Sequence, residues 1–265
     1  GMILNKHRRG FTLIEVLAAM AILSVLLLIL TRIFNETTRA WDLGQSDSES
    51  NMAGRAVMEF ITRDLSEAFA DVGVEFRVLS DEIPAYGEES DVVMFASLGE
   101  DPDGSDDRRA SSLVFYYLSE MKDTEGEDTG RFRLMRSHQS NIKTSEMQEL
   151  YDPGSDWTSP PKFSFPQPVA ENVTAFEVWA YRDPASARTS GPVEDYFSGS
   201  NGGNLPAWVD VYLEVLSEKD AIRASLYDAS NGREKAQLDE FLDQRAKGYQ
   251  ARVYFRNRAG YLGDR

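Results

Sequence analysis

Few side chains in this sequence could carry out catalysis. It contains no cysteine and two histidines, His7 and His138, so a serine–histidine–aspartate triad would need one of these two. No G-x-S-x-G motif accompanies a serine, and His138 is expected on the surface of a strand. The sequence also has no P-loop and no dinucleotide-binding glycine motif. These observations favour a protein without enzymatic activity.

Two carboxylates, Asp210 and Glu214, are close enough in sequence to suggest the acid pair of a glycosidase. They fall on a predicted strand, where four residues span about 13 Å, beyond the roughly 5–9.5 Å that such pairs require. We therefore expect both carboxylates on a solvated face of the sheet.

An acidic turn offers the residues for a metal site. Residues 101–107 read DPDGSDD, in which Asp101, Asp103 and Asp106 supply the hard oxygen ligands that Ca²⁺ prefers. The glycine is displaced from its place in an EF-hand loop, and no glutamate occupies the last position. We expect no cofactor; a solvated acidic loop and a Ca²⁺ site are the two alternatives for this turn.

A long apolar segment lies near the N-terminus. Phe11–Leu30 contains twenty residues whose only charge is Glu15, which is the length of a membrane-crossing helix. Two other interpretations are a secretory signal peptide, whose A-x-A cleavage site is missing here, and a buried core helix.

Charge is distributed unevenly around this segment. The leader before it contains Lys6, Arg8 and Arg9, whereas residues 11–265 carry 25 basic and 44 acidic residues, a net charge of −19. The positive-inside rule then places the leader in the cytoplasm and the C-terminal body across the membrane. The whole chain has a net charge of −16, which argues against a nucleic-acid partner.

Glu15 lies inside the apolar segment, four residues after Phe11. A lone acid there costs about 2.5–3.5 kcal/mol on insertion scales, and such residues usually mark a function or a partner. If the chain were cut between Gly10 and Phe11, Glu15 of one copy could neutralise the new α-amine of a neighbouring copy. Pairing would offset most of the burial cost of both charges. The alternative is a carboxylate that extends to the near interface.

Residues 9–17 read RGFTLIEVL, which resembles the N-terminal methylation motif of type IV pilins and type II secretion pseudopilins. The resemblance implies that a membrane prepilin peptidase cuts after Gly10 and methylates the new N-terminal Phe11, and that Glu15 guides assembly. It divides the N-terminal region into a cleaved basic leader at 1–10 and a transmembrane helix at 11–33.

A second helical part is expected after the span, at residues 34–72. There is no proline before Pro84, although the stretch 44–50 is a weak helix former that leaves room for a kink. An apolar stripe with helical spacing should pack on the protein's own sheet. Its members are Val57, Phe60, Ile61, Leu65, Ala68 and Phe69. The run Arg63-Asp64-Leu65 and the proline-free span are similar to minor rather than major pseudopilins.

After about residue 73 the hydrophobic pattern alternates, as in half-buried antiparallel strands. The predicted strands are Glu75–Leu79, Asp91–Ser97, Ser112–Leu118, Arg131–Ser137, Val173–Tyr181, Trp208–Leu216 and Gln250–Arg256. Loops are expected at Gly99–Asp107, Asp123–Gly130, Asp152–Pro161 and Pro184–Asn204, and a helix within Glu234–Ala246. The predicted fold is α+β and pilin-like, a long N-terminal α-helix packed on an antiparallel β-sheet domain at 73–265.

Within this domain, residues 176–183 (FEVWAYRD) and 205–213 (LPAWVDVYL) are similar to the J-type minor pseudopilin. There, a strand that ends in an aromatic residue precedes a Leu-Pro that opens the next strand. Pro206 can occupy a strand's first position without losing a ladder hydrogen bond. Two features depart from the type: the loop Pro184–Asn204 has no tryptophan, and the connection 216–250 is longer than usual.

The resemblance implies a minor pseudopilin that primes or caps a type II secretion pseudopilus. Its expected partners are other minor and major pseudopilins, the prepilin peptidase, the inner-membrane secretion platform and membrane lipid. Some pseudopilins bind calcium, which supports the Ca²⁺ alternative. The expected location is the inner membrane, with one span, a cytoplasmic N-terminus and a periplasmic C-terminal domain. The alternatives are a minor pilin of a type IV or competence pilus and a membrane-tethered binding or hydrolytic domain.

Overall fold

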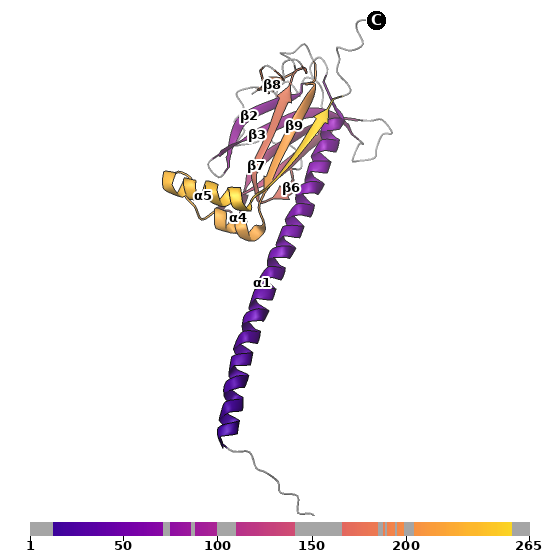
Figure 1. The fold of residues 1–265 in the computed structure, drawn as a ribbon. Helices are drawn as coiled ribbons and strands as arrows, with labels where there is room; N and C mark the ends of the chain where they lie inside the picture. The colour runs from indigo at the N-terminus through magenta and orange to yellow at the C-terminus, as the bar shows by residue number, and fades with distance from the viewer. Residues whose placement is uncertain are drawn as a thin grey trace, which may run out of the picture. The chain divides into compact units, whose positions relative to one another are not determined.

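In the computed structural model the chain consists of two compact units, Gly1–Ser48 and Glu49–Arg265. Figure 1 labels the helices and strands. The residues that the structure describes are 13–70, 75–85, 88–99, 110–140, 166–184, 188, 190–193, 195–198 and 204–255.

The first element is the 54-residue helix α1, Leu13–Ser66. Its backbone is helical through residues 44–50, where the sequence left room for a kink. In the first unit, leucine, isoleucine and alanine favour the helix, and the hydroxyls of Ser24 and Thr31 donate to the carbonyls four residues earlier, each at 2.8 Å. These hydroxyls are therefore satisfied within the helix itself.

The second unit contains two antiparallel sheets. The seven-stranded sheet has the order β6-β5-β4-β3-β2-β8, with β1 paired to β3, and the three-stranded sheet has the order β10-β9-β7. The first consists of β1 (Ala68–Phe69), β2 (Arg77–Ala85), β3 (Glu88–Gly99), β4 (Ala110–Lys122), β5 (Asp128–Ser140), β6 (Gln167–Glu171) and β8 (Tyr196–Phe197). The second consists of β7 (Val173–Tyr181), β9 (Trp208–Val215) and β10 (Lys247–Tyr254).

These elements confirm the predicted α+β, pilin-like architecture. All seven predicted strands are present, and Val173–Tyr181 agrees at both ends. The strand expected at Gln250–Arg256 begins earlier, at Lys247, and is described to Tyr254. The short strands β1, β6 and β8 were not predicted, and β8 lies inside the expected loop Pro184–Asn204.

Two helices connect β9 to β10. They are α4 (Glu218–Ala224), which was not predicted, and α5 (Gly232–Arg245), which was expected within Glu234–Ala246. The side chain of Ser217 caps α4 by accepting from the Asp220 amide, and Asn231 caps α5 in the same way. Each helix buries a short apolar side toward the core, through Ala221 and Ala224 in α4 and Leu238 and Phe241 in α5.

The chain passes from the larger to the smaller sheet at Asn172, which has a φ of 58° between β6 and β7. The edge of β7 that is not paired with β9 is then covered by side chains of β3. The Val178 amide donates to Asp91 Oδ2 at 2.7 Å, and the Phe176 amide donates to Ser90 Oγ at 3.4 Å. Side-chain acceptors thus take the place of a backbone partner at Phe176 and Val178, and further along β7 the Val193 amide donates to the Ala180 carbonyl at 2.9 Å.

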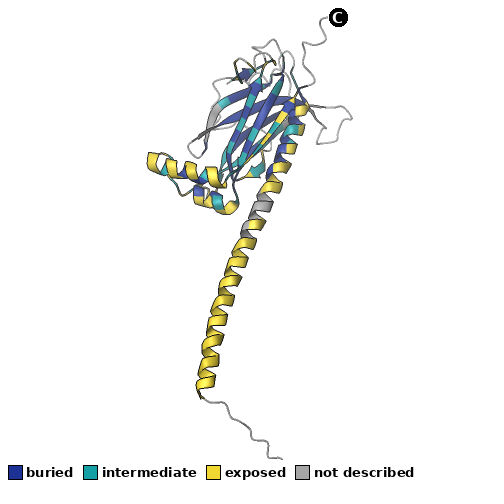
Figure 2. Cartoon of the chain, viewed as in Figure 1, coloured by how far each residue is buried: buried dark blue, intermediate teal, exposed yellow. Residues whose placement is uncertain are grey.

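Aromatic residues fill the core of the second unit. The ring of Phe76 packs against Phe95, Tyr196 and Phe255, with centroid distances of 5.2–6.2 Å. Tyr116 lies 6.3 Å from Phe95 and 6.5 Å from Phe176, so that rings from β3, β4 and β7 share one core. Figure 2 shows this core as dark blue strands.

Candidate assembly and anchoring site

The first unit contains a helix long and apolar enough to cross a membrane. The segment Leu13–Trp41 has a mean hydropathy of 2.9, and none of its most apolar window is buried within the structure (Figure 2). Its 29 residues extend about 43 Å, compared with about 30 Å for the hydrocarbon core of a bilayer. The described part of the chain has one such helix.

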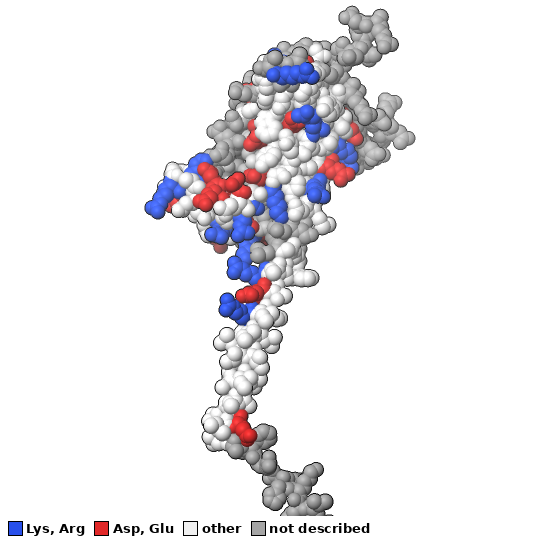
Figure 3. All heavy atoms as spheres, in the orientation of Figure 1, with Lys and Arg blue, Asp and Glu red and all other residues white. Residues whose placement is uncertain are grey.

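Glu15 lies in the first turn of α1 and is exposed. A carboxylate at this position interacts favourably with the helix dipole. Gly10 and Phe11, and with them the predicted cleavage and methylation site, lie outside the described residues. Figure 3 shows the apolar part of α1 as a long white stretch with charged groups at both ends.

The part of α1 in the second unit is held by its predicted apolar stripe. Val57, Ile61 and Leu65 are buried, and Phe60 is partly buried. These residues pack on the protein's own sheet, as predicted, but Ala68 and Phe69 do not belong to the helical stripe, because α1 ends at Ser66 and both residues form β1.

A buried acid on the same side of α1 fixes the helix to the larger sheet. Asp64 is 8% exposed, and its Oδ2 accepts hydrogen bonds from the Tyr116 hydroxyl of β4 and from Arg136 Nε of β5, both at 2.7 Å. Burial and the negative charge of Asp64 raise the pKa of Tyr116 far above its usual value of 10.0. The Asp64–Arg136 ion pair therefore has a neutral phenol as a third member.

The guanidinium groups of Arg63 and Arg136 also contact the Phe60 ring, at 5.4 and 5.3 Å from its centroid. The sequence contained a signal for this cluster, because Asp64 follows Val57 by seven residues and a carboxylate within an apolar stripe needs a partner. Without the strand register, the sequence did not identify Arg136 as that partner.

The smaller sheet contacts the same helix through Tyr249 of β10. Its hydroxyl donates to Asn51 Oδ1 at 3.0 Å, and its ring lies directly against Gly54, where a Cβ atom would overlap with ring carbons. Gly54 thus permits the close approach of helix and strand.

His138, the only candidate for a histidine base on a strand, is half-buried rather than on the surface as predicted. It follows Ser137 on β5 and lies opposite Val114 of β4. Burial lowers its pKa below 6.5, the Arg136 charge lowers it further, and the Asp64 charge opposes both. No hydrogen bond joins His138 to a serine in the described part of the chain, so its geometry does not support a triad.

The prediction of a solvated face was wrong for Asp210. It is 4% exposed, and its two oxygens accept from Arg252 Nε and Nη2, both at 2.6 Å. In the strand register, Asp210 lies between Trp179 of β7 and Arg252 of β10. The Arg252 guanidinium also lies over the ring of Trp208, and these bulky side chains cover Asp210.

Glu214 also has structural partners. It accepts from the Thr174 hydroxyl at 2.8 Å and from the Tyr212 hydroxyl at 3.1 Å. Burial, together with the Glu214 charge, raises the pKa of Tyr212 to about 12. Both carboxylates of the suspected pair are therefore engaged in structural contacts of the smaller sheet.

Asp101, Asp103 and Asp106, the suggested Ca²⁺ ligands, lie outside the described residues. Within the described ranges, no group of three His, Asp or Glu side chains could hold a metal ion.

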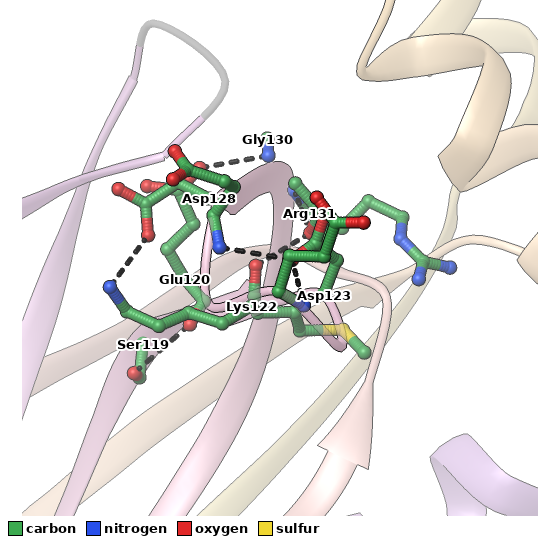
Figure 4. A network of polar contacts seen from close by, with 11 residues as sticks. Ser119, Glu120, Lys122, Asp123, Asp128, Gly130 and Arg131 are labelled. Carbon is green, nitrogen blue, oxygen red and sulfur yellow. Dashed lines mark hydrogen bonds and ion pairs between the residues drawn. The ribbon is translucent and has the colours of Figure 1, made fainter.

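In the acidic turn between β4 and β5, a carboxylate accepts hydrogen bonds from backbone amides of the same turn (Figure 4). Asp123 Oδ1 accepts from the Glu125 and Glu127 amides at 2.8 and 2.9 Å, and the Glu127 amide is the main cause of its lowered pKa. Lys122 pairs with Asp128 at 3.2 Å. These acids shape their own turn.

Comparisons with known proteins identify the N-terminal segment and one relative. A family model described as the prokaryotic N-terminal methylation motif matches residues 5–31. The pilin-like protein PilA3 of Thermus thermophilus is 31% identical over 175 residues, which are 64% of this chain and 66% of that protein. The chain thus spans slightly less than two thirds of the relative that it matches. No solved structure matches the chain.

Pilin-like proteins are structural, assemble with other pilins and are processed by prepilin peptidase. The methylation motif, the similarity to PilA3, and the apolar helix followed by an antiparallel sheet domain together support a type IV pilin-like protein.

Proposed function

We propose that this chain is a minor pseudopilin, a non-enzymatic subunit that primes or caps a type II secretion pseudopilus. The observation that carries the proposal is the contrast within α1. Its first part exposes an apolar surface with Glu15 at the start, and its second part is fixed to the sheets by a buried stripe and the Asp64 ion pair. Such a subunit can be stored in a membrane and recruited into a fibre through its helix.

In this proposal, prepilin peptidase removes residues 1–10 after Gly10 and methylates Phe11. The helix at 11–33 crosses the inner membrane, α1 continues to Ser66 rather than to the predicted residue 72, and the body that follows lies in the periplasm. Glu15 neutralises the α-amine of a neighbouring subunit during assembly, which offsets the cost of two buried charges. The partners are other pseudopilins and the inner-membrane secretion platform.

The direct test is the N-terminal mass of the chain after expression with its prepilin peptidase. We expect a mature chain that begins at methylated Phe11. An intact leader under those conditions, with the peptidase active on another prepilin, would contradict the proposal.

A second candidate is a minor pilin of a type IV or competence pilus, which the similarity to a pilin-like protein favours. Extraction of the processed chain from the membrane and identification of the co-purifying subunits distinguish the two. Pseudopilins and a secretion platform would support the first proposal, and pilus subunits would support the second.

A membrane-tethered binding or hydrolytic domain is the alternative from another class. The assembly proposal predicts that Glu15→Leu inserts into the membrane but is not incorporated into the fibre. The tether alternative predicts that this variant works normally. Glu36→Leu, which removes an exposed acid from a later turn of α1, is the matched control and should be incorporated.

Calcium binding by Asp101, Asp103 and Asp106 stays a proposal. Calorimetric titration of the purified chain with Ca²⁺ tests it, with the triple Asn variant as the control. No heat at millimolar Ca²⁺ would contradict it.

A further inference from the structure

The C-terminal end of the apolar segment carries two arginines and two aromatic residues in a regular arrangement. Arg32 and Arg39 are seven residues apart, as are Phe34 and Trp41, and all four are exposed. Seven residues make two helical turns, so each pair shares one side of α1, and the offset of two residues places the pairs on nearly opposite sides. This end of the helix has a basic side and an aromatic side.

The positions of the two arginines along the helix axis match the headgroup layer of a bilayer. The apolar run Leu13–Leu30, whose only charge is Glu15, is about 27 Å long, close to the hydrocarbon thickness of about 30 Å. Arg32 then lies about 3 Å beyond Leu30 and Arg39 about 13 Å beyond it, on either side of the headgroup layer. Since arginine side chains extend along a helix to reach polar surroundings, both guanidinium groups can reach this layer.

The two guanidinium groups at this end are exposed and can donate hydrogen bonds to an anion. Arg32 Nε contacts Glu36 Oε1 at 3.3 Å, but both side chains are at least 70% exposed, so the pair is solvated and weak. Arg39 is exposed. Over Arg32–Trp41 two arginines and one glutamate leave a net charge of +1, which Asp42 at the next position balances, so the attraction for an anion rests on the donors that the guanidinium groups retain. The charged groups begin where the white stretch of α1 ends (Figure 3).

We propose that Arg32 and Arg39 bind the phosphate groups of anionic phospholipids at the C-terminal end of the membrane span, with Phe34 and Trp41 in the same interface. This rests on the proposed membrane anchoring and names the lipid partner of that segment. Aromatic residues are enriched at this level of a bilayer, and basic side chains are attracted to anionic headgroups. The contact sets the depth of the helix, and therefore the depth of Glu15, which is 17 residues or about 26 Å from Arg32.

The test uses the full chain reconstituted in vesicles of phosphatidylcholine and phosphatidylglycerol. The lipids that stay bound after release in mild detergent are counted by native mass spectrometry. We expect enrichment of phosphatidylglycerol on the unmodified chain. R32Q or R39Q should reduce that preference roughly fivefold each, and the double variant about 30-fold. E36Q removes the competing carboxylate and should increase the preference.

The matched control is R55Q/R233Q, which removes the same charge from exposed positions outside this segment and should leave lipid binding unchanged. If R32Q/R39Q keeps the full preference, or if the control loses as much, the inference is wrong. Soluble glycerol phosphate should not compete, and competition at low millimolar concentration would also contradict a headgroup site. Alkaline extraction of the same vesicles reports insertion: an unmodified chain that fails to insert contradicts the anchoring itself, and with it this inference.

Discussion

The two parts of α1 contain similar apolar residues but bury them differently. In Leu13–Trp41 the large apolar side chains are exposed on all sides, whereas in the second unit Val57, Ile61 and Leu65 are buried along one side. A helix that is apolar all round needs apolar surroundings, whereas a one-sided stripe needs only a sheet. The difference shows that one helix is suited to two environments. The contacts of Asp64 with Tyr116 and Arg136 belong only to the part that packs on the sheet.

A large effect is expected from breaking these contacts. Asp64→Ala leaves the partly buried Arg136 without its carboxylate, so the free energy of unfolding of the second unit should fall by about 3 kcal/mol. Urea unfolding of the full chain in detergent, followed by tryptophan fluorescence, measures it. Asp239→Ala, which removes an exposed acid paired with Lys235, should change stability by less than about 0.5 kcal/mol. A similar loss for both variants would contradict a special role of Asp64.

A matched pair of truncations tests the contrast between the two parts directly. Ile61 is fully buried and Leu23 is 56% exposed. Ile61→Ala should lower the free energy of unfolding by about 2–5 kcal/mol, and Leu23→Ala should leave it nearly unchanged. The same unfolding assay serves both. If Leu23→Ala were as destabilising as Ile61→Ala, the first part would be packed against protein, contrary to the structure.

Two glycines of α1 provide a smaller contrast. Gly54→Ala should destabilise the second unit by about 1–3 kcal/mol, because its Cβ overlaps with the Tyr249 ring. Gly44→Ala has nothing within 4 Å of its Cβ and should stabilise the helix by up to about 1 kcal/mol. Thermal unfolding followed by circular dichroism should therefore show shifts of opposite sign, and equal signs would contradict the packing of Tyr249.

The smallest effect concerns pH. Because the pKa of His138 is lowered below 6.5 in the folded chain, the unfolded chain takes up the proton first as the pH falls. The stability that neutral His138 contributes is present above pH 6.5 and is lost below it. His138→Gln should therefore lose less stability than the unmodified chain between pH 7.5 and pH 5. Parallel losses in urea unfolding would show that His138 does not contribute.

Sequence patterns predicted the parts of the fold with strong periodicity. The stripe of α1 and the alternation in β7 and β9 were clear because one side of each element is apolar and the other polar. The strands β1 and β8 have two residues each, too few for any period, and β6 contains Pro168. The seven-residue helix α4 shows little periodicity because Ile222 is exposed.

The candidate site residues also differ in whether local sequence spacing could identify them. Glu15 could be identified from sequence because it interrupts an apolar run, which local spacing reveals. The burial of Asp210 depends on the cross-strand neighbours Trp179 and Arg252, and the partner of Asp64 is 72 residues away. Pairing across strands follows from register, which the sequence pattern did not provide.

The covered edge of β7 has a consequence for the proposed assembly. Strand edges with free amides and carbonyls template pairing with other chains, and such pairing is very difficult to reverse. At β7 the amides of Phe176 and Val178 are already occupied by Ser90 and Asp91, so a second copy cannot extend the smaller sheet there. In the proposed fibre, neighbouring subunits could not join their smaller sheets along this edge, so their contacts would have to be made elsewhere on the subunit.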